Sequence, residues 1–140
     1  MKLFIDTWGW LTLRDRSEVR HQEVRSYYEA FRQAGGTGCT TDYVLDETIT
    51  LLFRRLDFQA ATESVGLLQK AIAEGYLHLE QVTPERFEKA KQLRFRLRDK
   101  LRISFTDLTS MVVMQERGVT HILTEDEHFA HVGLGLQTVP

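Results

Sequence analysis

The sequence of 140 residues has one cysteine, two prolines and no apolar run near the length of about 20 residues that a membrane span needs. Because Cys39 is the only cysteine, no disulfide can form within the chain, and we expect a cytoplasmic protein in a reducing compartment. The N-terminal residues reach the charged side chain of Asp6 too early for a signal peptide. We therefore expect no association with a membrane.

A large excess of charge of one sign is also missing. The formal net charge is -2, with 42% hydrophobic and 27% charged residues, which is typical of a folded globular protein. The length is that of one ordinary domain, and no repeat or low-complexity linker divides it, so we expect a single domain over residues 1–140. The glycine-rich loops that cradle phosphates are absent too, which argues against nucleotide-driven or dinucleotide chemistry.

Short apolar runs alternate along the chain with segments of helical spacing. This alternation predicts an α/β domain with a short, mostly parallel central sheet. The expected strands are 3–5, 37–41, 76–82, 120–124 and 136–139. The expected helices are 17–36, 42–56, 58–74, 83–101 and 104–118, with one helical turn at 126–129. In such a sheet the functional crevice lies outside the carboxyl ends of the strands.

Four acidic residues stand where these elements end or begin. Asp6 ends the first strand, Glu47 lies in the helix after the second strand, Asp107 is in the first turn of its helix, and Asp126 follows the strand before it. Parallel topology would bring all four to one edge of the sheet. Like charges there repel one another unless a cation lies between them. The set therefore predicts a site for Mg²⁺ or Mn²⁺, which prefer oxygen ligands.

Each acid also has an ordinary structural interpretation. Asp107 has the spacing for a capping box with Ser104, and Asp6 has the position to close a turn. Glu47 fits a solvated helix face, and Asp126 fits the start of a helix, where the helix dipole favours acidic residues. The specific signal is the whole set in order, and no single member carries it.

Four segments of the chain resemble those of the PIN-domain ribonucleases, and most closely the VapC-like toxins of type II toxin–antitoxin pairs. They are FIDTWGWL, TTDYVLDETITLL, SFTDLTSMVVMQERG and HILTEDEHF, and they span nearly the whole sequence. The resemblance implies a three-layer α/β/α sandwich and a metal-dependent endoribonuclease. It also implies a homodimer and a small antitoxin that neutralises the enzyme.

By this resemblance, the catalytic and metal-binding residues are Asp6, Glu47, Asp107 and Asp126. The hydroxyl residues around the site, with roles in orienting the acids or contacting the nucleotide phosphate, are Thr7, Ser104 and Thr106. His128 is expected to pack or hydrogen-bond locally and not to act as a base. Asp99 matches a position that is often acidic in the family, and we leave it outside the ligand set.

A basic stretch precedes the third acid. Residues 86–102 hold eight basic and two acidic residues, which suits contact with a phosphate backbone. The alternative is a solvated helix face. The candidate RNA contacts are Arg94, Arg98, Lys100 and Arg102. A second, weaker set is Arg14, Arg16, Arg20 and Arg25. Trp8 and Trp10 are candidates for stacking a base or for packing in the core or a dimer.

Two other functions fit the same fold. One is a stand-alone nuclease that processes RNA or cuts structured DNA, and the other is a PIN-like interaction module without catalysis. Acids at all four positions argue against the second. A phospho-acceptor receiver domain would need a lysine at a late strand end, which the stretch THILTED lacks.

Overall fold

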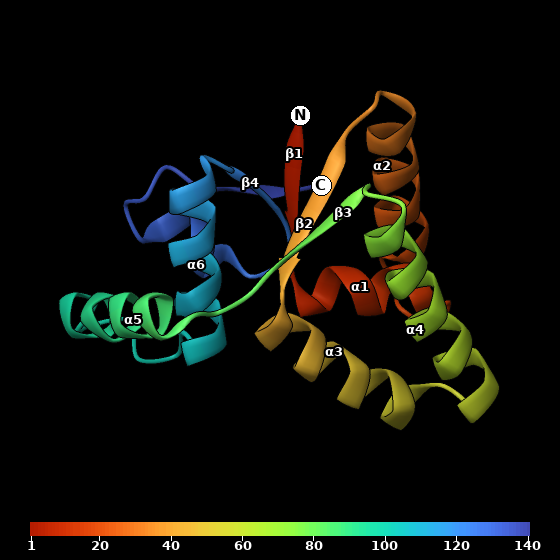
Figure 1. The fold of residues 1–140 in the computed structure, drawn as a ribbon, viewed down its shortest axis with the longest axis horizontal. Coiled ribbons are helices and arrows are strands. Elements are labelled where there is room, and N and C mark those ends of the chain that lie inside the picture. Colours follow the sequence, from red (N-terminus) through yellow and green to blue (C-terminus); the bar gives the residue numbers. More distant parts are fainter.

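A five-stranded parallel sheet forms the centre of the protein in a computed structural model that describes residues 1–140 (Figure 1). The strand order is β3-β2-β1-β4-β5, and every neighbouring pair is parallel. The strands are β1 (Lys2–Ile5), β2 (Thr37–Thr41), β3 (Leu77–Glu80), β4 (His121–Leu123) and β5 (Gln137–Val139). The expected short parallel sheet is confirmed.

Helices cover both faces of this sheet and complete the expected three-layer α/β/α sandwich. Between β1 and β3 the chain forms α1 (Thr7–Arg14), α2 (His21–Gln33), α3 (Asp42–Arg55) and α4 (Phe58–Ala73). Between β3 and β4 it forms α5 (Pro84–Arg96) and α6 (Phe105–Arg117), and the short helix η1 (Glu127–His131) precedes β5. Figure 1 places α2 and α4 on one side of the sheet and α5 and α6 on the other. None of the helices is both long and apolar enough to cross a membrane.

The middle of the sheet is buried on both faces. Leu3, Phe4 and Ile5 of β1 have no exposed surface, as expected for a central parallel strand covered by helices on both sides. In α6 the run from Leu108 to Met114 is buried throughout, so this helix packs against the sheet along most of its length. Burial of this kind fixes the position of the first turn of α6 relative to the end of β1.

The helix α1 was not among the expected elements. Its sequence, TWGWLTLR, contains threonine, tryptophan and glycine, which are weaker helix formers than alanine or leucine. The helix forms because Trp10 and Leu11 are buried in the core. A Cβ atom at Gly9 would lie 2.8 Å from the carbonyl oxygen of Leu123, so only glycine allows α1 to pass this close to β4.

Two expected helices are shorter than the sequence pattern indicates. The helix expected over 83–101 ends at Arg96, because the following residues fold into a loop. The helix expected over 17–36 begins at His21, because Ser17 bonds to Asp15 in a turn instead of capping the helix. Thr41 caps α3, and the predicted capping role of Ser104 is confirmed; each accepts a hydrogen bond from its own helix.

The order of the strands reverses beside β1. From β1 the chain proceeds to β2 and β3 on one side, and then returns to β4 and β5 on the other. In parallel α/β sheets a crevice opens at such a switch point, outside the carboxyl ends of the strands. The register pairs Ile5 with Leu123, so the residues that follow β1 and β4 meet at this crevice.

Candidate active site

The ends of β1 and β4 are tied together by a buried hydrogen bond. The Thr124 hydroxyl, directly after β4, donates to Asp6 Oδ2 at 3.0 Å, and the backbone N–H of Asp6 donates to the Leu123 carbonyl at 3.3 Å. Thr124 is 2% exposed and Asp6 is 7% exposed. The Asp6 carboxylate is therefore held in place at the switch point of the sheet.

No positive side chain compensates the charge of Asp6. Burial raises the pKa of Asp6 to about 7, and the negative charges of Asp107 and Glu47 raise it further, while hydrogen bonds from the Thr7 backbone and Thr124 oppose the shift. A carboxyl group with this pKa carries a proton for part of the time at neutral pH. Such a group binds a cation readily in its ionised form, because the positive charge of the cation offsets the repulsion between Asp6 and the neighbouring acids.

Asp107 takes the structural role considered for it and also lies near the other acids. Its backbone N–H donates to Ser104 Oγ at 3.0 Å, and its Oδ2 accepts from the Ser104 N–H at 3.3 Å, which completes a capping box. Burial raises the pKa of Asp107 to about 6 against the Ser104 hydrogen bonds, and the charges of Asp126 and Glu47 add to the rise. The capping box fixes the side chain while leaving it close to the other acids.

Asp126 and Glu47 complete the acidic set from two other elements. Asp126 caps η1: its Oδ1 accepts from the His128 N–H at 2.9 Å and lies 2.8 Å from His128 Nδ1. Glu47 is exposed on α3, and its charge reaches both Asp6 and Asp107. Asp107 thus lies within electrostatic range of the other three acids, and Asp6 within range of Asp107 and Glu47. His128 bonds locally, as expected.

The donor set suits a hard cation that keeps part of its water. No three side chains among Asp, Glu, His and Cys are close enough together to enclose an ion by themselves. Mg²⁺ is held through one or two carboxylates and several waters, and this looser arrangement of oxygen donors is compatible with that mode. The Thr7 hydroxyl, buried beside Asp6, has no hydrogen-bond partner and offers another oxygen for a bound water.

The other predicted hydroxyl residues differ in their surroundings. The Ser104 hydroxyl accepts a hydrogen bond from the Asp107 N–H in the capping box. Thr106 is half-buried, and its carbonyl accepts a 2.6 Å hydrogen bond from the Thr109 hydroxyl. Thr124, which holds Asp6, was missed in the sequence. Its only signal is its position, directly after a strand and two residues before an acid of the set.

The basic residues of the predicted RNA surface lie at the connection between α5 and α6. Arg98 and Arg102 are exposed, and Lys100 is half-buried. Arg94 is half-buried at the end of α5, with its guanidinium directed to the carbonyls of the connection. Asp99 is exposed in the same connection, which is consistent with its omission from the ligand set.

The two tryptophans near Asp6 have different environments. Trp10 is 6% exposed, and its Nε1–H donates to Thr40 Oγ1 at 3.5 Å, so it belongs to the core as one interpretation expected. Trp8 is half-buried, with the Arg20 guanidinium 5.2 Å from the centre of its ring.

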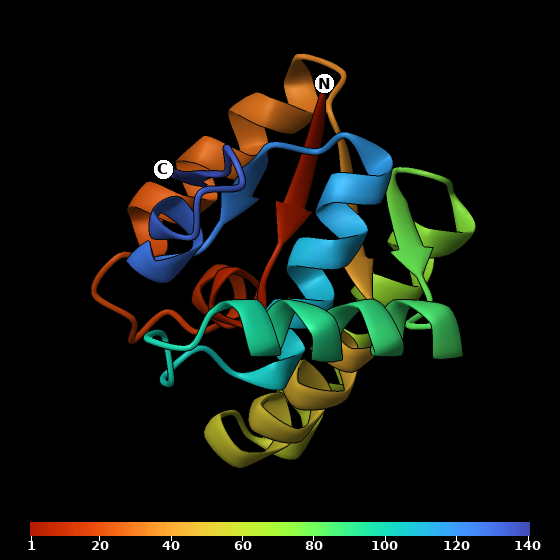
Figure 2. The ribbon, with the colours of Figure 1, turned by 90° about the vertical axis from the view of Figure 1, so that its left-hand side faces the viewer.

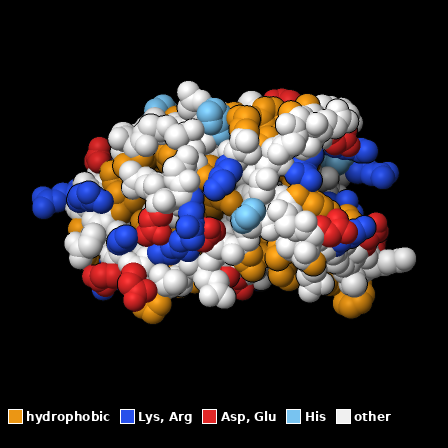
Figure 3. Space-filling model, turned by 45° about the horizontal axis from the view of Figure 1, so that its top comes forward, with side chains coloured by type: hydrophobic (Ala, Val, Ile, Leu, Met, Phe, Trp, Pro, Cys, Tyr) orange, Lys and Arg blue, Asp and Glu red, His pale blue; other side chains and the backbone are white.

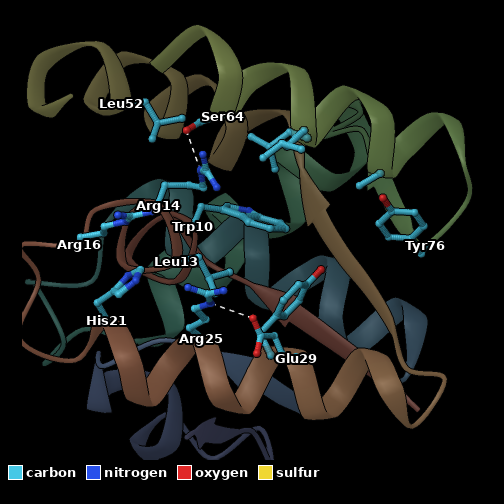
Figure 4. A pocket seen from close by; sticks show the side chains of 14 residues that line it. Trp10, Leu13, Arg14, Arg16, His21, Arg25, Glu29, Leu52, Ser64 and Tyr76 are labelled. Carbon is cyan, nitrogen blue, oxygen red and sulfur yellow. Dashed lines mark hydrogen bonds and ion pairs between the residues drawn. The ribbon is translucent and has the colours of Figure 1, made fainter. Parts of the chain in front are cut away.

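A separate pocket of about 440 Å³ opens between α1, α2 and α4 (Figure 4). Its walls include Trp10, Leu13 and Leu67, and Arg14 and Arg25 also line it. Arg14 Nε donates to Ser64 Oγ, and Arg25 Nε donates to Glu29, each at 2.8 Å. None of the four acids lines this pocket, so it is distinct from the acidic site.

The fold and the site together define a parallel α/β/α protein with an acidic cluster at the switch point of its sheet. The chain belongs to the PIN domain family, whose sequence model matches residues 3–134. This match confirms the family that the four sequence segments indicate.

Similar proteins of known function or structure are VapC toxins. The 23S rRNA-specific endonuclease VapC20 of Mycobacterium tuberculosis is 28% identical over 131 residues, which cover 94% of each chain. The crystal structure of that protein, described as a sarcin-ricin loop cleaving toxin, superimposes with a TM-score of 0.79 over 94% of this chain and 95% of the other.

Two VapBC complexes bound to DNA share the fold. The VapBC2 structure from Rickettsia felis matches with a TM-score of 0.75 at 14% identity, over 99% of this chain and 98% of the other. The VapBC structure from Salmonella typhimurium matches with a TM-score of 0.67 at 14% identity, over 99% and 97%.

Proposed function

We propose that this protein is a metal-dependent endoribonuclease that hydrolyses RNA phosphodiester bonds. The observation that carries the proposal is the uncompensated acidic cluster at the switch point, where two carboxyl groups have strongly raised pKa values. Its similarity to a 23S rRNA-specific endonuclease supports RNA as the substrate. The same comparison favours a toxin over a stand-alone processing enzyme.

In this mechanism, Asp6 and Asp107 would hold Mg²⁺ or Mn²⁺, with Glu47 bonded directly or through water. When bound, such an ion supplies activation of a water molecule and neutralises charge that develops on the phosphate. Thr124 keeps one Asp6 oxygen fixed by donating to it. Asp126, which contacts His128, would orient water or help to hold a second ion.

The test is cleavage of a mixed pool of tRNA, rRNA and mRNA by the purified protein, with the ends of the products mapped. We expect cleavage with Mg²⁺ or Mn²⁺, none in EDTA, and none by Asp6→Asn under any of these conditions. Cleavage that continues in EDTA, or that survives Asp6→Asn, would reject the mechanism.

We further propose that a cognate antitoxin neutralises the enzyme in the cytoplasm. The apolar pocket between α1, α2 and α4, with arginines among its lining residues, fits an antitoxin segment with apolar and acidic side chains (Figure 4). The partner is expected to be a short protein encoded in a neighbouring reading frame. Leu67→Lys should prevent neutralisation by this partner while RNA cleavage continues. Leu79→Lys, an exposed apolar position on β3, is the matched control that should remain neutralised.

The homodimer implied by the resemblance remains a proposal. An exposed apolar patch is formed by Ile49, Phe53 and Phe58, which are 37%, 40% and 77% exposed, with the two phenylalanine rings 5.5 Å apart. We propose that a second copy of the chain covers this patch. Light scattering should give a dimer mass for the parent and a monomer mass for Phe53→Glu; a monomeric parent would contradict the proposal.

A further inference from the structure

The connection between α5 and α6 is organised by a single side chain. Arg94 donates to three backbone carbonyls: those of Leu97 at 2.5 Å, Lys100 at 2.8 Å and Ile103 at 3.0 Å. These bonds fold residues 97–103 into a compact loop, which we call the basic loop. A guanidinium with several fixed donors can hold such a loop in one shape, which a single ammonium group does less well.

The structure divides the basic stretch into a balanced part and an unbalanced part. In α5, Arg86 pairs with Glu80 and Glu116, Lys89 pairs with Glu116, and Lys91 pairs with Glu88. In the basic loop, Arg98 and Arg102 are exposed and make no ion pair. Lys100 has only Asp99 at 3.8 Å. Arg96, the last residue of α5, is exposed and also makes no ion pair. The positive charge that remains available to a ligand is therefore at the C-terminal end of α5 and in the loop, and not along the rest of the helix.

This unpaired charge lies beside the acidic site. The basic loop is followed directly by Ser104, whose backbone N–H and hydroxyl both bond to Asp107. Figure 2 shows the connection between α5 and α6 at the end of the sheet to which the strand arrows point. Asp6 and Asp126 follow β1 and β4 at this same end of the sheet. On the face drawn in Figure 3, by contrast, basic and acidic side chains are interspersed. A phosphate chain that enters the acidic site needs such cations nearby, because the acids repel it.

We propose that the basic loop binds the RNA backbone next to the bond that is cut, and that Arg94 is the positioning residue that holds the loop ready. Arg98 and Arg102 contact phosphates, while Arg94 acts through the loop without touching RNA. The inference rests on the proposed ribonuclease function and adds the surface that holds the substrate. An acidic protein segment is the competing occupant. The acidic site next to the loop favours RNA as the occupant. Only the substrate must contact the basic loop and the acidic site at the same time.

Two double variants with equal loss of charge test the loop. Each is made in Asp6→Asn, so that RNA binding can be measured without cleavage. Arg98→Gln/Arg102→Gln removes the unpaired cations, and Lys89→Gln/Lys91→Gln removes paired ones from the helix. With a labelled single-stranded RNA, we expect the loop variant to weaken binding about tenfold or more and to reduce the salt slope by about 1.4, as loss of two phosphate contacts requires. The helix variant should stay within about twofold of the parent.

Arg94→Lys tests the positioning role, since it keeps the charge but loses the planar fork of donors. In the cleavage-competent protein we expect KM to rise about fivefold with kcat nearly unchanged. Trypsin should cut after Arg98 and Lys100 faster than in the parent, while cleavage elsewhere stays the same. Arg96→Lys, an exposed arginine of the same helix, is the matched control and should change neither property.

Three results would overturn the inference: equal binding by the loop and helix variants, no RNA binding by the Asp6→Asn parent, or parental KM and trypsin resistance in Arg94→Lys. Weaker binding of the antitoxin but not of RNA in the loop variant would also overturn it, in favour of the protein segment. These outcomes are separate from the ribonuclease proposal, because cleavage by the wild-type protein is measured independently of binding.

Discussion

Two clusters of charged side chains lie against the same parallel sheet, and only one of them is balanced. At the β3 edge, Arg86 is 8% exposed and pairs with Glu116 at 2.8 Å and with Glu80 at 3.1 Å. Burial raises the pKa of Glu80, but hydrogen bonds from Arg117 and Arg86 outweigh it and hold the pKa below its usual value. This cluster contains its own counter-charges and needs no ligand.

The second cluster, at the ends of β1 and β4, has acids and no cation of the protein among them. Burial and the neighbouring acids raise the pKa of both Asp6 and Asp107. The acid pKa values shift in opposite directions because Glu80 is less buried and has two guanidinium partners, whereas Asp6 and Asp107 are more deeply buried and have no positive partner. The comparison teaches that burial without a counter-charge marks the candidate site. The predictions below disturb one cluster at a time.

The largest expected effect is the loss of activity in Asp6→Asn. The amide has nearly the same shape but cannot hold a cation as a carboxylate does, so we expect RNA cleavage and toxicity on expression to fall by at least about 100-fold. The fold should persist, because the substitution removes repulsion. Cleavage assays and circular dichroism measure the two properties, and undiminished toxicity of the folded variant would refute the metal-nuclease account.

The balanced cluster should respond in the opposite way. Arg86→Met removes the partner shared by Glu80 and Glu116, while Arg117 and Lys89 still pair with them. We expect the free energy of unfolding to fall by about 2 kcal/mol, as for loss of hydrogen bonds between charged groups. Urea unfolding measures this loss. At temperatures where the variant is folded, RNA cleavage should stay near the parental rate. A selective loss of cleavage without loss of stability would show that the two clusters are coupled.

Stability without metal should depend on pH through the acidic cluster. In the unfolded chain Asp6 ionises near its ordinary pKa of 3.8, whereas the folded pKa is about 7, so the folded state keeps a proton that the unfolded state loses. The free energy of unfolding should therefore decrease between about pH 4 and 7 and then level off, by at most about 4 kcal/mol. Urea unfolding in EDTA across this range checks it, and Asp6→Asn should reduce the decrease without abolishing it, because the pKa of Asp107 is also raised, to about 6.

The smallest predicted effect concerns Thr124. Thr124→Val keeps the shape but loses the hydrogen bond to Asp6, and cleavage should fall about tenfold, as for loss of a hydrogen bond to a charged group. Thr124→Ser keeps the hydroxyl and should stay within about twofold. Equal rates for the two variants would remove Thr124 from the site.

The sequence was sufficient to place Asp6, Asp107 and Asp126, because each stands at the end or start of an element whose apolar pattern is clear, whereas Glu47 lies inside its helix. An apolar strand that runs directly into Asp6, in a chain of alternating strands and helices, locates that carboxylate at the edge of the sheet. The spacing of Ser104 and Asp107 likewise predicts the capping box that the structure contains.

Features that depend on distant contacts were not predictable in this way. The helix α1 forms in spite of Trp8 and Gly9 because burial of its apolar side chains in the core stabilises it. Gly9 is needed only because the Leu123 carbonyl is adjacent. The helical spacing of α5 continues past its end, and nothing local signals that Arg94 turns back to bond the loop. A threonine such as Thr124 fits many roles, and only the register of β1 and β4 identifies its partner.

The central claim is that the acidic cluster binds a divalent cation. The most direct test is isothermal titration calorimetry at pH 7.5, with Mn²⁺ titrated into the wild-type protein, Asp6→Asn and Arg86→Met. The account predicts saturable binding by the wild type and by Arg86→Met, with loss of at least about tenfold in affinity in Asp6→Asn. Equal affinity in the wild type and Asp6→Asn, or no binding by any of the three, would contradict it.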